Sequence, residues 1–247
     1  MPMAGVKLFP QNLKSSIDEL RWDEIYHTYW NQDEFVVIPH FVSGELLEQL
    51  IKEAESLESK LNRNYIPGHK KGGSVSHFVI RENAPSLQAF YQDPSLISFL
   101  NRLTGRNLLL SPKHDPHACA LYYYTEKGDH IGFHYDTSYY QGSRYTLLLG
   151  LVNKSASQLL CRLHTRDKNR QPIELSLSTE PGMLIIFNGD KLYHSVSPSQ
   201  EGEKRIVFTM EYLTSTRMNS FYRLFSNLKD AFGYFGLRSL FQSYRRR

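Results

Sequence analysis

Two histidines, one aspartate and one arginine could together form a metal site: His134, Asp136, His194 and Arg205. His134 and Asp136 stand two positions apart in an expected strand, so their side chains would project side by side from one face. With His194 they would supply two imidazoles and one carboxylate, the ligand set of non-haem Fe(II) sites that keep positions open for substrate and O2. Arg205, in the next expected strand, could bind a carboxylate through two parallel hydrogen bonds. We therefore expect a metal centre with an anion-binding group beside it.

Strands on both sides of short turns must position these residues. The run LYYY at 121–124 is apolar and aromatic, and the Gly-Asp pair at 128–129 marks a turn before a second strand at 131–135. The Asn-Gly pair at 188–189 is a strong hairpin signal, and it would return the chain along 191–196 and carry the second histidine to the centre. Further strands are expected at 34–38, 107–110, 145–152, 158–163, 172–176, 183–187 and 205–212.

Many short strands separated by turn signals are typical of a sandwich or jelly roll. The sequence has no alternation of strands and helices, no long Gly-rich phosphate loop and no internal repeat. Before the strand series, apolar residues at helical spacing predict helices, and Ser43 is a candidate cap for the second of them. The helices are expected at 17–30, 44–57, 85–91 and 94–103.

The order of these features resembles the Fe(II)- and 2-oxoglutarate-dependent oxygenases, most closely the branch similar to prolyl 4-hydroxylases. The resemblance covers 121–212, from the Tyr-rich strand through His-x-Asp and PGMLIIFNGDKLYHSV to the basic residue on the following strand. It implies a mainly β fold with flanking helices, built on a double-stranded β-helix with the metal at its open mouth. We expect a single domain, with a helical and strand region at 1–105, the jelly-roll core at 106–213 and a helical tail at 214–247.

The resemblance also implies roles for the four residues. His134, Asp136 and His194 would be the iron ligands and leave three positions on an octahedral metal. 2-Oxoglutarate, the cosubstrate, would occupy two of these positions and O2 the third. Arg205 would pair with the distal carboxylate of 2-oxoglutarate.

Further residues are expected around that carboxylate. Either Tyr124 or Tyr122 would donate its hydroxyl, depending on which one faces inward. Thr209 shares a strand face with Arg205 and would extend the same pocket. Many family members have Ser or Thr two residues after the arginine, where this chain has Val207, so one hydrogen bond to the cosubstrate is expected to be missing.

The resemblance implies an enzyme that converts 2-oxoglutarate to succinate and CO2 and then abstracts hydrogen from a C–H bond. Halogenating members of the family have a small residue at the position of Asp136, which frees a site for chloride. A carboxylate there favours hydroxylation, while desaturation, ring closure and epoxidation remain open.

Cations and aromatics near the expected mouth suit an anionic or zwitterionic small molecule such as an amino acid. A side chain of a peptide or protein is the alternative substrate, because relatives similar to prolyl hydroxylases act on both kinds. Residues 60–84, rich in Gly, Lys and Pro, are expected to form a mobile basic loop that covers the metal as a lid. The candidate substrate residues are Tyr139, Tyr140, Arg144, Arg162, His164 and Lys70.

Three competing interpretations were weighed against the oxygenase. The cluster His114-Asp115-Pro116-His117 could be a rival ligand set, but Pro116 breaks the backbone, so the segment is interpreted as a turn. A catalytically silent binding protein on the same jelly roll would not need an intact His134, Asp136 and His194. A cupin-like metal enzyme that does not use 2-oxoglutarate would not need Arg205.

Composition narrows the partners. The 247 residues carry a net charge of +4, a mild excess that does not suggest a nucleic-acid-binding arm. Two cysteines, Cys119 and Cys161, do not suggest a disulfide framework. The N-terminus lacks the apolar segment of a signal peptide, and no run of 18 apolar residues occurs. A cytoplasmic location is expected.

The tail from residue 214 carries Phe221, Phe225, Leu228, Phe232 and Phe235 at helical spacing. We expect this stripe to pack over the barrel or at a homodimer contact. Docking on a membrane surface, assisted by Arg238 and Arg245 to Arg247, is the alternative.

Overall fold

The computed structural model describes residues 13–138 and 140–218. The helices are α1 (Leu13–Asp18), α2 (Trp22–Asn31), α3 (Gly44–Ser56), the short 3-10 helix η1 (Glu58–Lys60), α4 (His77–Asn83), α5 (Pro85–Tyr91) and α6 (Pro94–Thr104). The first strands are β1 (Phe35–Ile38), β2 (Asn62–Ile66), β3 (Lys70–Ser76), β4 (Leu109–Leu110), β5 (Cys119–Tyr124) and β6 (His130–His134). The later strands are β7 (Arg144–Lys154), β8 (Leu159–Leu163), β9 (Ile173–Leu177), β10 (Leu184–Asn188), β11 (Tyr193–Val196) and β12 (Lys204–Leu213).

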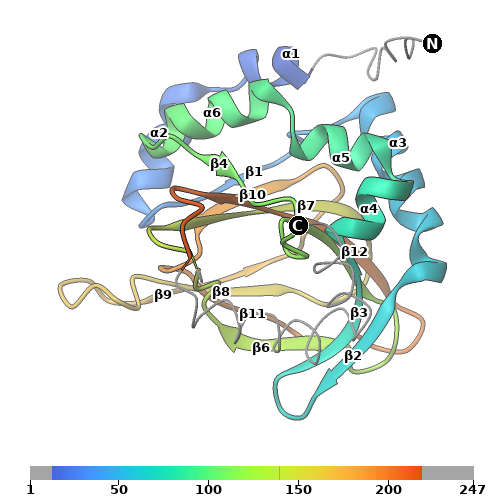
Figure 1. Cartoon of the computed structure of the whole chain (residues 1–247). Helices are drawn as coiled ribbons and strands as arrows, with labels where there is room; N and C mark the ends of the chain where they lie inside the picture. Colours follow the sequence, from blue (N-terminus) through green and yellow to red (C-terminus); the bar gives the residue numbers. More distant parts are fainter. Residues whose placement is uncertain (1–12, 139, 219–247) are drawn as a thin grey trace, which may run out of the picture.

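The strands form one antiparallel sheet that winds back on itself. Its order is β1-β10-β7-β12-β5-β3-β6-β11-β8-β9, with β2 added to β3 and β4 added to β12. One half of the sheet, made of β1, β10, β7, β12 and β5, lies beneath the helices in Figure 1. The other half, made of β6, β11, β8 and β9, lies below the first half. β3 joins the two halves because it pairs with both β5 and β6. The mainly β fold with flanking helices, built as a jelly roll, is therefore confirmed.

Alternation along the central strands creates two apolar layers. In β7, Leu147 and Leu149 belong to the cluster shared with the helices, whereas Leu148 belongs to the cluster inside the winding. In β10, Ile186 faces the helices and Ile185 faces the interior. Because both faces are covered, these strands are apolar throughout. The interior layer is the one that surrounds the candidate site.

Most of the predicted helices and strands lie close to their observed bounds, and one difference falls near the N-terminus. The helix expected at 17–30 is divided into α1 and α2 by residues 19–21. Ser43 precedes α3 but makes no side-chain capping hydrogen bond. Both cysteines are buried free thiols, and burial raises the pKa of Cys161 to about 12.

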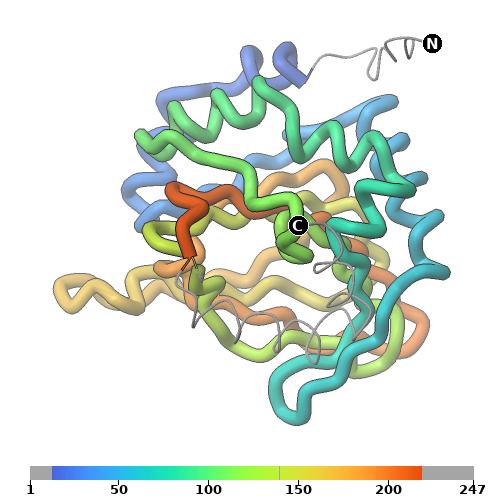
Figure 2. Tube along the Cα trace, viewed as in Figure 1, coloured from blue at the N-terminus to red at the C-terminus, as the bar shows by residue number. Residues whose placement is uncertain are grey.

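The mobile loop predicted at 60–84 is wrong, because this segment forms β2, β3 and α4; its role as a lid stays a prediction. In Figure 2 it runs in cyan along the side of the molecule, from the helices toward the lower strands. Gly73 allows close packing: a Cβ at this position would lie 3.1 Å from the Leu61 side chain and 3.4 Å from Tyr123 Cβ. Lys70, expected to be mobile, is buried.

The hairpin predicted at 188–189 is also wrong. β10 and β11 do not pair with each other: β10 pairs with β1 and β7, and β11 pairs with β6 and β8. The turn between them carries the chain from one half of the sheet to the other (Figure 1). β5 and β6 are likewise separated, by β3. By contrast, β8 and β9 form a true hairpin.

Most of the predicted C-terminal helix, with its homodimer and membrane alternatives, lies outside the described residues. Within the part of the chain that is described, no helix combines the length and the apolar character that crossing a membrane requires.

Candidate metal centre

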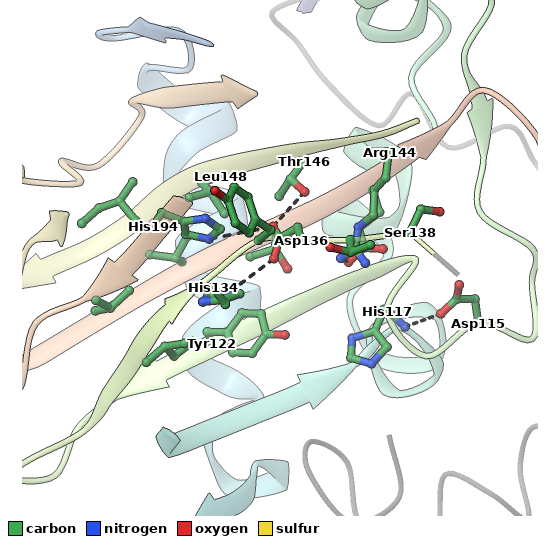
Figure 3. Close-up of a pocket in the computed structure, with 18 of the residues that line it drawn as sticks. Asp115, His117, Tyr122, His134, Asp136, Ser138, Arg144, Thr146, Leu148 and His194 are labelled. Carbon is green, nitrogen blue, oxygen red and sulfur yellow. Dashed lines mark hydrogen bonds and ion pairs between the residues drawn. The ribbon is translucent and has the colours of Figure 1, made fainter. Parts of the chain in front are cut away.

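The structure brings His134, Asp136 and His194 together. His134 ends β6, His194 lies in β11, and the two residues are cross-strand partners. Asp136 Oδ1 lies 3.3 Å from His134 Nε2, and Asp136 Oδ2 lies 3.9 Å from His194 Nε2. One ligand atom from each residue lies within 4.8 Å of the other two. Figure 3 shows the three side chains turned toward one another.

The contacts that position Asp136 differ from those that the sequence predicted. β6 ends at His134, so Asp136 does not share a strand face with it. Instead, the backbone of Asp136 packs against Gly189 in the turn after β10. Thr146 in β7 holds the carboxylate by donating a hydrogen bond from Oγ1 to Asp136 Oδ2, at 3.0 Å (Figure 3).

Both imidazoles are oriented by backbone carbonyl groups. His134 Nδ1 lies 2.8 Å from the Gly132 oxygen, and His194 Nδ1 lies 3.3 Å from the Leu192 oxygen. A carbonyl oxygen only accepts, so each Nδ1 carries a hydrogen, and in the neutral form of each ring it is Nε2 that has the free lone pair. The free lone pairs are on the nitrogens that face Asp136, as metal ligation requires.

The charge states also suit a divalent cation. Burial alone would raise the pKa of Asp136, but His194, His134 and Arg144 together hold it well below its ordinary range. Burial lowers the pKa of His194 to about 4, against the opposing effect of Asp136. At neutral pH the centre therefore offers an ionised carboxylate and a neutral His194 imidazole, the forms that bind metals.

The three residues line a cavity of about 300 Å³ that also reaches Arg205. Arg205 is 1% exposed. Its Nη2 donates to Thr179 Oγ1 at 2.9 Å, whereas Nε and Nη1 are buried with no hydrogen-bond partner among the described residues. Burial lowers the pKa of this guanidinium, although Tyr124, 4.9 Å away by its ring centroid, opposes the shift. A carboxylate ligand would supply an acceptor for this guanidinium, whose donors the described residues leave partly unsatisfied.

The other residues expected near Arg205 also line the cavity. Tyr122 and Tyr124 both face it, since they are two positions apart in β5. Val207 contributes an apolar surface. Thr209 lines the cavity as well, and its hydroxyl already donates to the Ala120 carbonyl at 3.1 Å.

Of the predicted substrate residues, only Tyr140 and Arg144 line the cavity, and Tyr139 lies outside the described residues. Arg162, His164 and Lys70 do not line it, and a role for them toward a substrate stays a prediction.

Strand geometry explains why two of these three residues lie away from the cavity. Arg162 points away from the interior that its β8 neighbours fill, pairs with Glu174 at 2.8 Å, and lies over the Phe133 ring. Lys70 is buried in β3 with its Nζ 4.7 Å from the Tyr122 ring centroid. His164, just after β8, is buried in a left-handed backbone conformation.

Several cavity residues were missed. Asp115 and His117 belong to the segment interpreted as a turn; it is a turn, yet both side chains line the cavity (Figure 3). Asp115 accepts from the Tyr140 hydroxyl at 2.9 Å and from the His117 backbone N–H at 2.8 Å. Glu211, which forms an ion pair with Arg144, also lines the cavity. Continuing the alternation of β12 beyond Thr209 would have found Glu211, whereas Asp115 and His117 were noticed in the sequence only as part of a rival ligand set.

Comparisons with known proteins give a family match over part of the chain and several structures of similar fold. A model of the family described as "HalD: Halogenase D" matches residues 20–142, which include His134 and Asp136. Curated protein sequences give no match.

Similar solved structures include three with TM-scores near 0.6. The non-haem α-ketoglutarate-dependent epimerase SnoN from nogalamycin biosynthesis is 13% identical over 77% of this chain and 81% of its own, with a TM-score of 0.63. A prolyl hydroxylase from Trichoplax adhaerens, solved with a hypoxia-inducible-factor peptide, is 14% identical over 87% and 95%, with a TM-score of 0.59. EctD from S. alaskensis, solved with 2-oxoglutarate and 5-hydroxyectoine, is 15% identical over 78% and 76%, with a TM-score of 0.59.

Proposed function

Because the chain has the fold of the Fe(II)/2-oxoglutarate-dependent oxygenases, we propose that it is such an enzyme, with His134, Asp136 and His194 holding Fe(II). The observation that carries the proposal is that the three ligand atoms share a cavity with a buried arginine. A buried guanidinium without a carboxylate partner is costly. Among the described residues Arg205 has no such partner, so a bound dicarboxylate would supply it.

When bound, iron and 2-oxoglutarate would supply the oxidising chemistry with O2 as the oxidant, and succinate and CO2 would be by-products. The chain's own residues bind and orient. Arg205 would hold the distal carboxylate through its buried guanidinium, which keeps unsatisfied N–H donors, and Tyr124 lies beside it. Val207 and Leu148 line the cavity with apolar surface, which limits water around the reacting groups. Thr146 keeps the Asp136 carboxylate in one orientation.

Hydroxylation is the proposed outcome. The family model that matches describes a halogenase, yet this chain has a carboxylate at residue 136, where halogenating relatives have a small residue. Asp136 lies with His134 and His194 and would occupy the position that a halide would need. Oxygen transfer is therefore favoured over halogen transfer.

The substrate is proposed to be a small amino-acid-like molecule with an ammonium group. Asp115 and Glu211 supply two carboxylates to the cavity, whereas Arg144 supplies one guanidinium and already pairs with Glu211. An ammonium group would donate a hydrogen bond to the Asp115 carboxylate. Arg144 Nε is buried with no hydrogen-bond partner among the described residues, so it could donate to a substrate carboxylate. A cavity of about 300 Å³ is at the small end for ligand sites.

The first test is spectroscopic. Fe(II) and 2-oxoglutarate are added without O2 to the purified protein, which should give a weak visible charge-transfer band. Asp136→Ala should abolish it. Arg205→Met should weaken 2-oxoglutarate binding by about 10- to 100-fold, since a charge-assisted hydrogen bond contributes roughly 1.5–3 kcal/mol. The matched control is Lys204→Met, because Lys204 pairs with Glu55 and Glu58 outside the cavity. If the wild-type protein gives no band, the proposal is wrong.

The second test identifies the substrate class. O2-dependent succinate release is measured with free amino acids and with peptides that contain the same residues. Stimulation by a free amino acid would support the small-molecule substrate. Stimulation by peptides alone would overturn it in favour of the protein side-chain alternative and leave the oxygenase assignment intact.

A further inference from the structure

Glu34 is a buried carboxylate at an unusual place in the backbone. It lies just before β1 and is 7% exposed. Asp33 and Glu34 both have positive φ angles, 60° and 63°, in the left-handed region that side chains with a Cβ rarely adopt. Such a conformation persists only where surrounding contacts impose it. The contacts of Glu34 identify what imposes it here.

Four side chains from three separate segments converge on this carboxylate. Tyr145 donates its hydroxyl to Oε2 at 2.9 Å, and Tyr29 does so at 3.4 Å. Asn188 donates Nδ2 to the same oxygen at 3.1 Å, and Lys191 Nζ lies 2.8 Å from Oε1. The Glu34 carbonyl also accepts from the Asn188 backbone N–H at 3.0 Å. Glu34 thereby binds both the first and the last residue of the segment from Asn188 to Lys191.

This segment, with Leu192, forms the turn that links the two halves of the sheet, the 188–192 turn. It is closed internally, since the Asn188 carbonyl accepts from the N–H groups of Lys191 and Leu192 at 3.0 and 3.2 Å. Glu34 binds one side of it. The other side faces the metal centre.

The 188–192 turn contacts two of the three metal-ligand residues. Gly189 packs so closely on Asp136 that a Cβ would lie 2.6 Å from the Asp136 carbonyl oxygen. The Leu192 carbonyl binds His194 Nδ1 and fixes its tautomer. A shift of the turn would therefore move Asp136 and turn the His194 ring.

A second connection runs through β7. Tyr145 binds Glu34 on one face of the strand, and the next residue, Thr146, binds Asp136 on the opposite face. Tyr145 is also the cross-strand partner of Asn188. The network around Glu34 thus reaches Asp136 from two directions.

We propose that Glu34 is a positioning residue for the metal centre: its carboxylate fixes the 188–192 turn and the start of β7, which in turn place Asp136 and His194. The proposal rests on the proposed function only in that these residues bind a divalent metal. Glu34 does not touch the cavity and takes no part in the reaction itself. Its effect is on the geometry and affinity of the site.

The test uses the full-length protein loaded with Co(II), whose visible absorption reports coordination geometry. Glu34→Gln keeps the size of the side chain but places an amide NH2 against groups that donate. We expect Co(II) affinity to fall at least about tenfold, as is typical when groups that orient ligands are changed. We also expect the absorption bands of bound Co(II) to change in position or intensity.

The matched control is Glu53→Gln. Glu53 is equally buried, at 7% exposed, and its carboxylate accepts backbone N–H groups of Ser86 and Leu87 at the start of α5. Its change should lower thermal stability without changing Co(II) affinity or spectrum. A purely structural role for Glu34 would make the two variants alike, and that result would overturn the proposal.

If Glu34→Gln does not fold, a milder variant tests the same proposal. Tyr145→Phe removes one hydroxyl donor to Glu34 and should weaken Co(II) binding by about threefold with a smaller spectral change. Unchanged affinity and spectrum in whichever of these variants folds would refute the positioning role. If the wild-type protein does not bind Co(II), it is the proposed metal function that fails, so the two failures are distinguishable.

Discussion

Gly189 and Asp136 are in such close contact that a Cβ on Gly189 would lie 2.9 Å from the Cβ of Asp136 and 2.6 Å from its carbonyl oxygen. Gly189 has no positive φ, so this position requires glycine for space and not for backbone conformation. The glycine of the Asn-Gly pair therefore acts at the candidate metal centre, although its sequence context is that of a hairpin.

Gly189→Ala should push Asp136 away from the two histidines. We expect metal affinity to fall at least about tenfold, measured by titration with Fe(II) or Co(II) against a chelator. Gly202→Ala is the control, since Gly202 has a positive φ of 80° and a Cβ added to it would have no neighbouring atom within 4 Å. That change should cost roughly 1 kcal/mol of stability and leave affinity unaltered. Equal affinities in the two variants would contradict the close-contact argument.

Thr146→Val removes the hydrogen bond to Asp136 Oδ2 while keeping the shape of the side chain. The carboxylate would lose its fixed orientation, so metal affinity should fall about tenfold, and stability by about 1 kcal/mol. Thr104→Val is the comparison, because Thr104 Oγ1 makes a similar buried bond to the Leu100 carbonyl in α6. It should lower stability by a similar amount and leave metal titrations unchanged. Loss of affinity in Thr104→Val would show that general destabilisation is responsible.

Asp115→Asn should weaken binding of an ammonium-bearing substrate. Loss of the charge should raise KM about 10- to 100-fold, since a hydrogen bond to a charged group contributes roughly 1.5–3 kcal/mol, while succinate release at saturation changes little. Asp93→Asn is the control, because Asp93 caps α6 away from the cavity and Asn is as good a cap. A KM for Asp115→Asn within about twofold of the wild-type value would mean that Asp115 does not contact the ammonium group.

Glu34 should make stability depend on pH. Burial alone would raise the pKa of Glu34, but hydrogen bonds from Lys191, Asn188 and Tyr145 outweigh it and hold the pKa below its ordinary 4.5. A lowered folded-state pKa means that the ionised group stabilises the fold above about pH 4.5 and loses this effect as the pH falls through the folded-state value.

Urea unfolding of the metal-free protein from about pH 3 to pH 7, compared with Glu34→Gln, measures this effect. The stability difference between the two proteins should stay constant near neutral pH and shrink below about pH 4.5. A difference that persists unchanged to about pH 3 would show that the charge of Glu34 does not contribute.

Much of this protein could be predicted from local patterns. The alternation of apolar residues places β7, β10 and β12 within a few residues of their observed bounds, and it places Arg205, Val207 and Thr209 on one face. The types and order of the histidines, the aspartate and the arginine were enough to expect a metal centre with a carboxylate-binding group. These inferences succeed because periodicity and ligand chemistry are properties of short segments.

Pairing between distant segments was decided only by the tertiary structure. The Asn-Gly turn joins two halves of the sheet instead of closing a hairpin, β3 inserts between β5 and β6, and Lys70 is buried as a consequence. Asp115 meets Tyr140, and Glu34 meets Asn188. The sequence by itself determined which residues could bind a metal and a carboxylate. Which residues surround them depended on long-range contacts, whose energies come from packing between segments that no local pattern records.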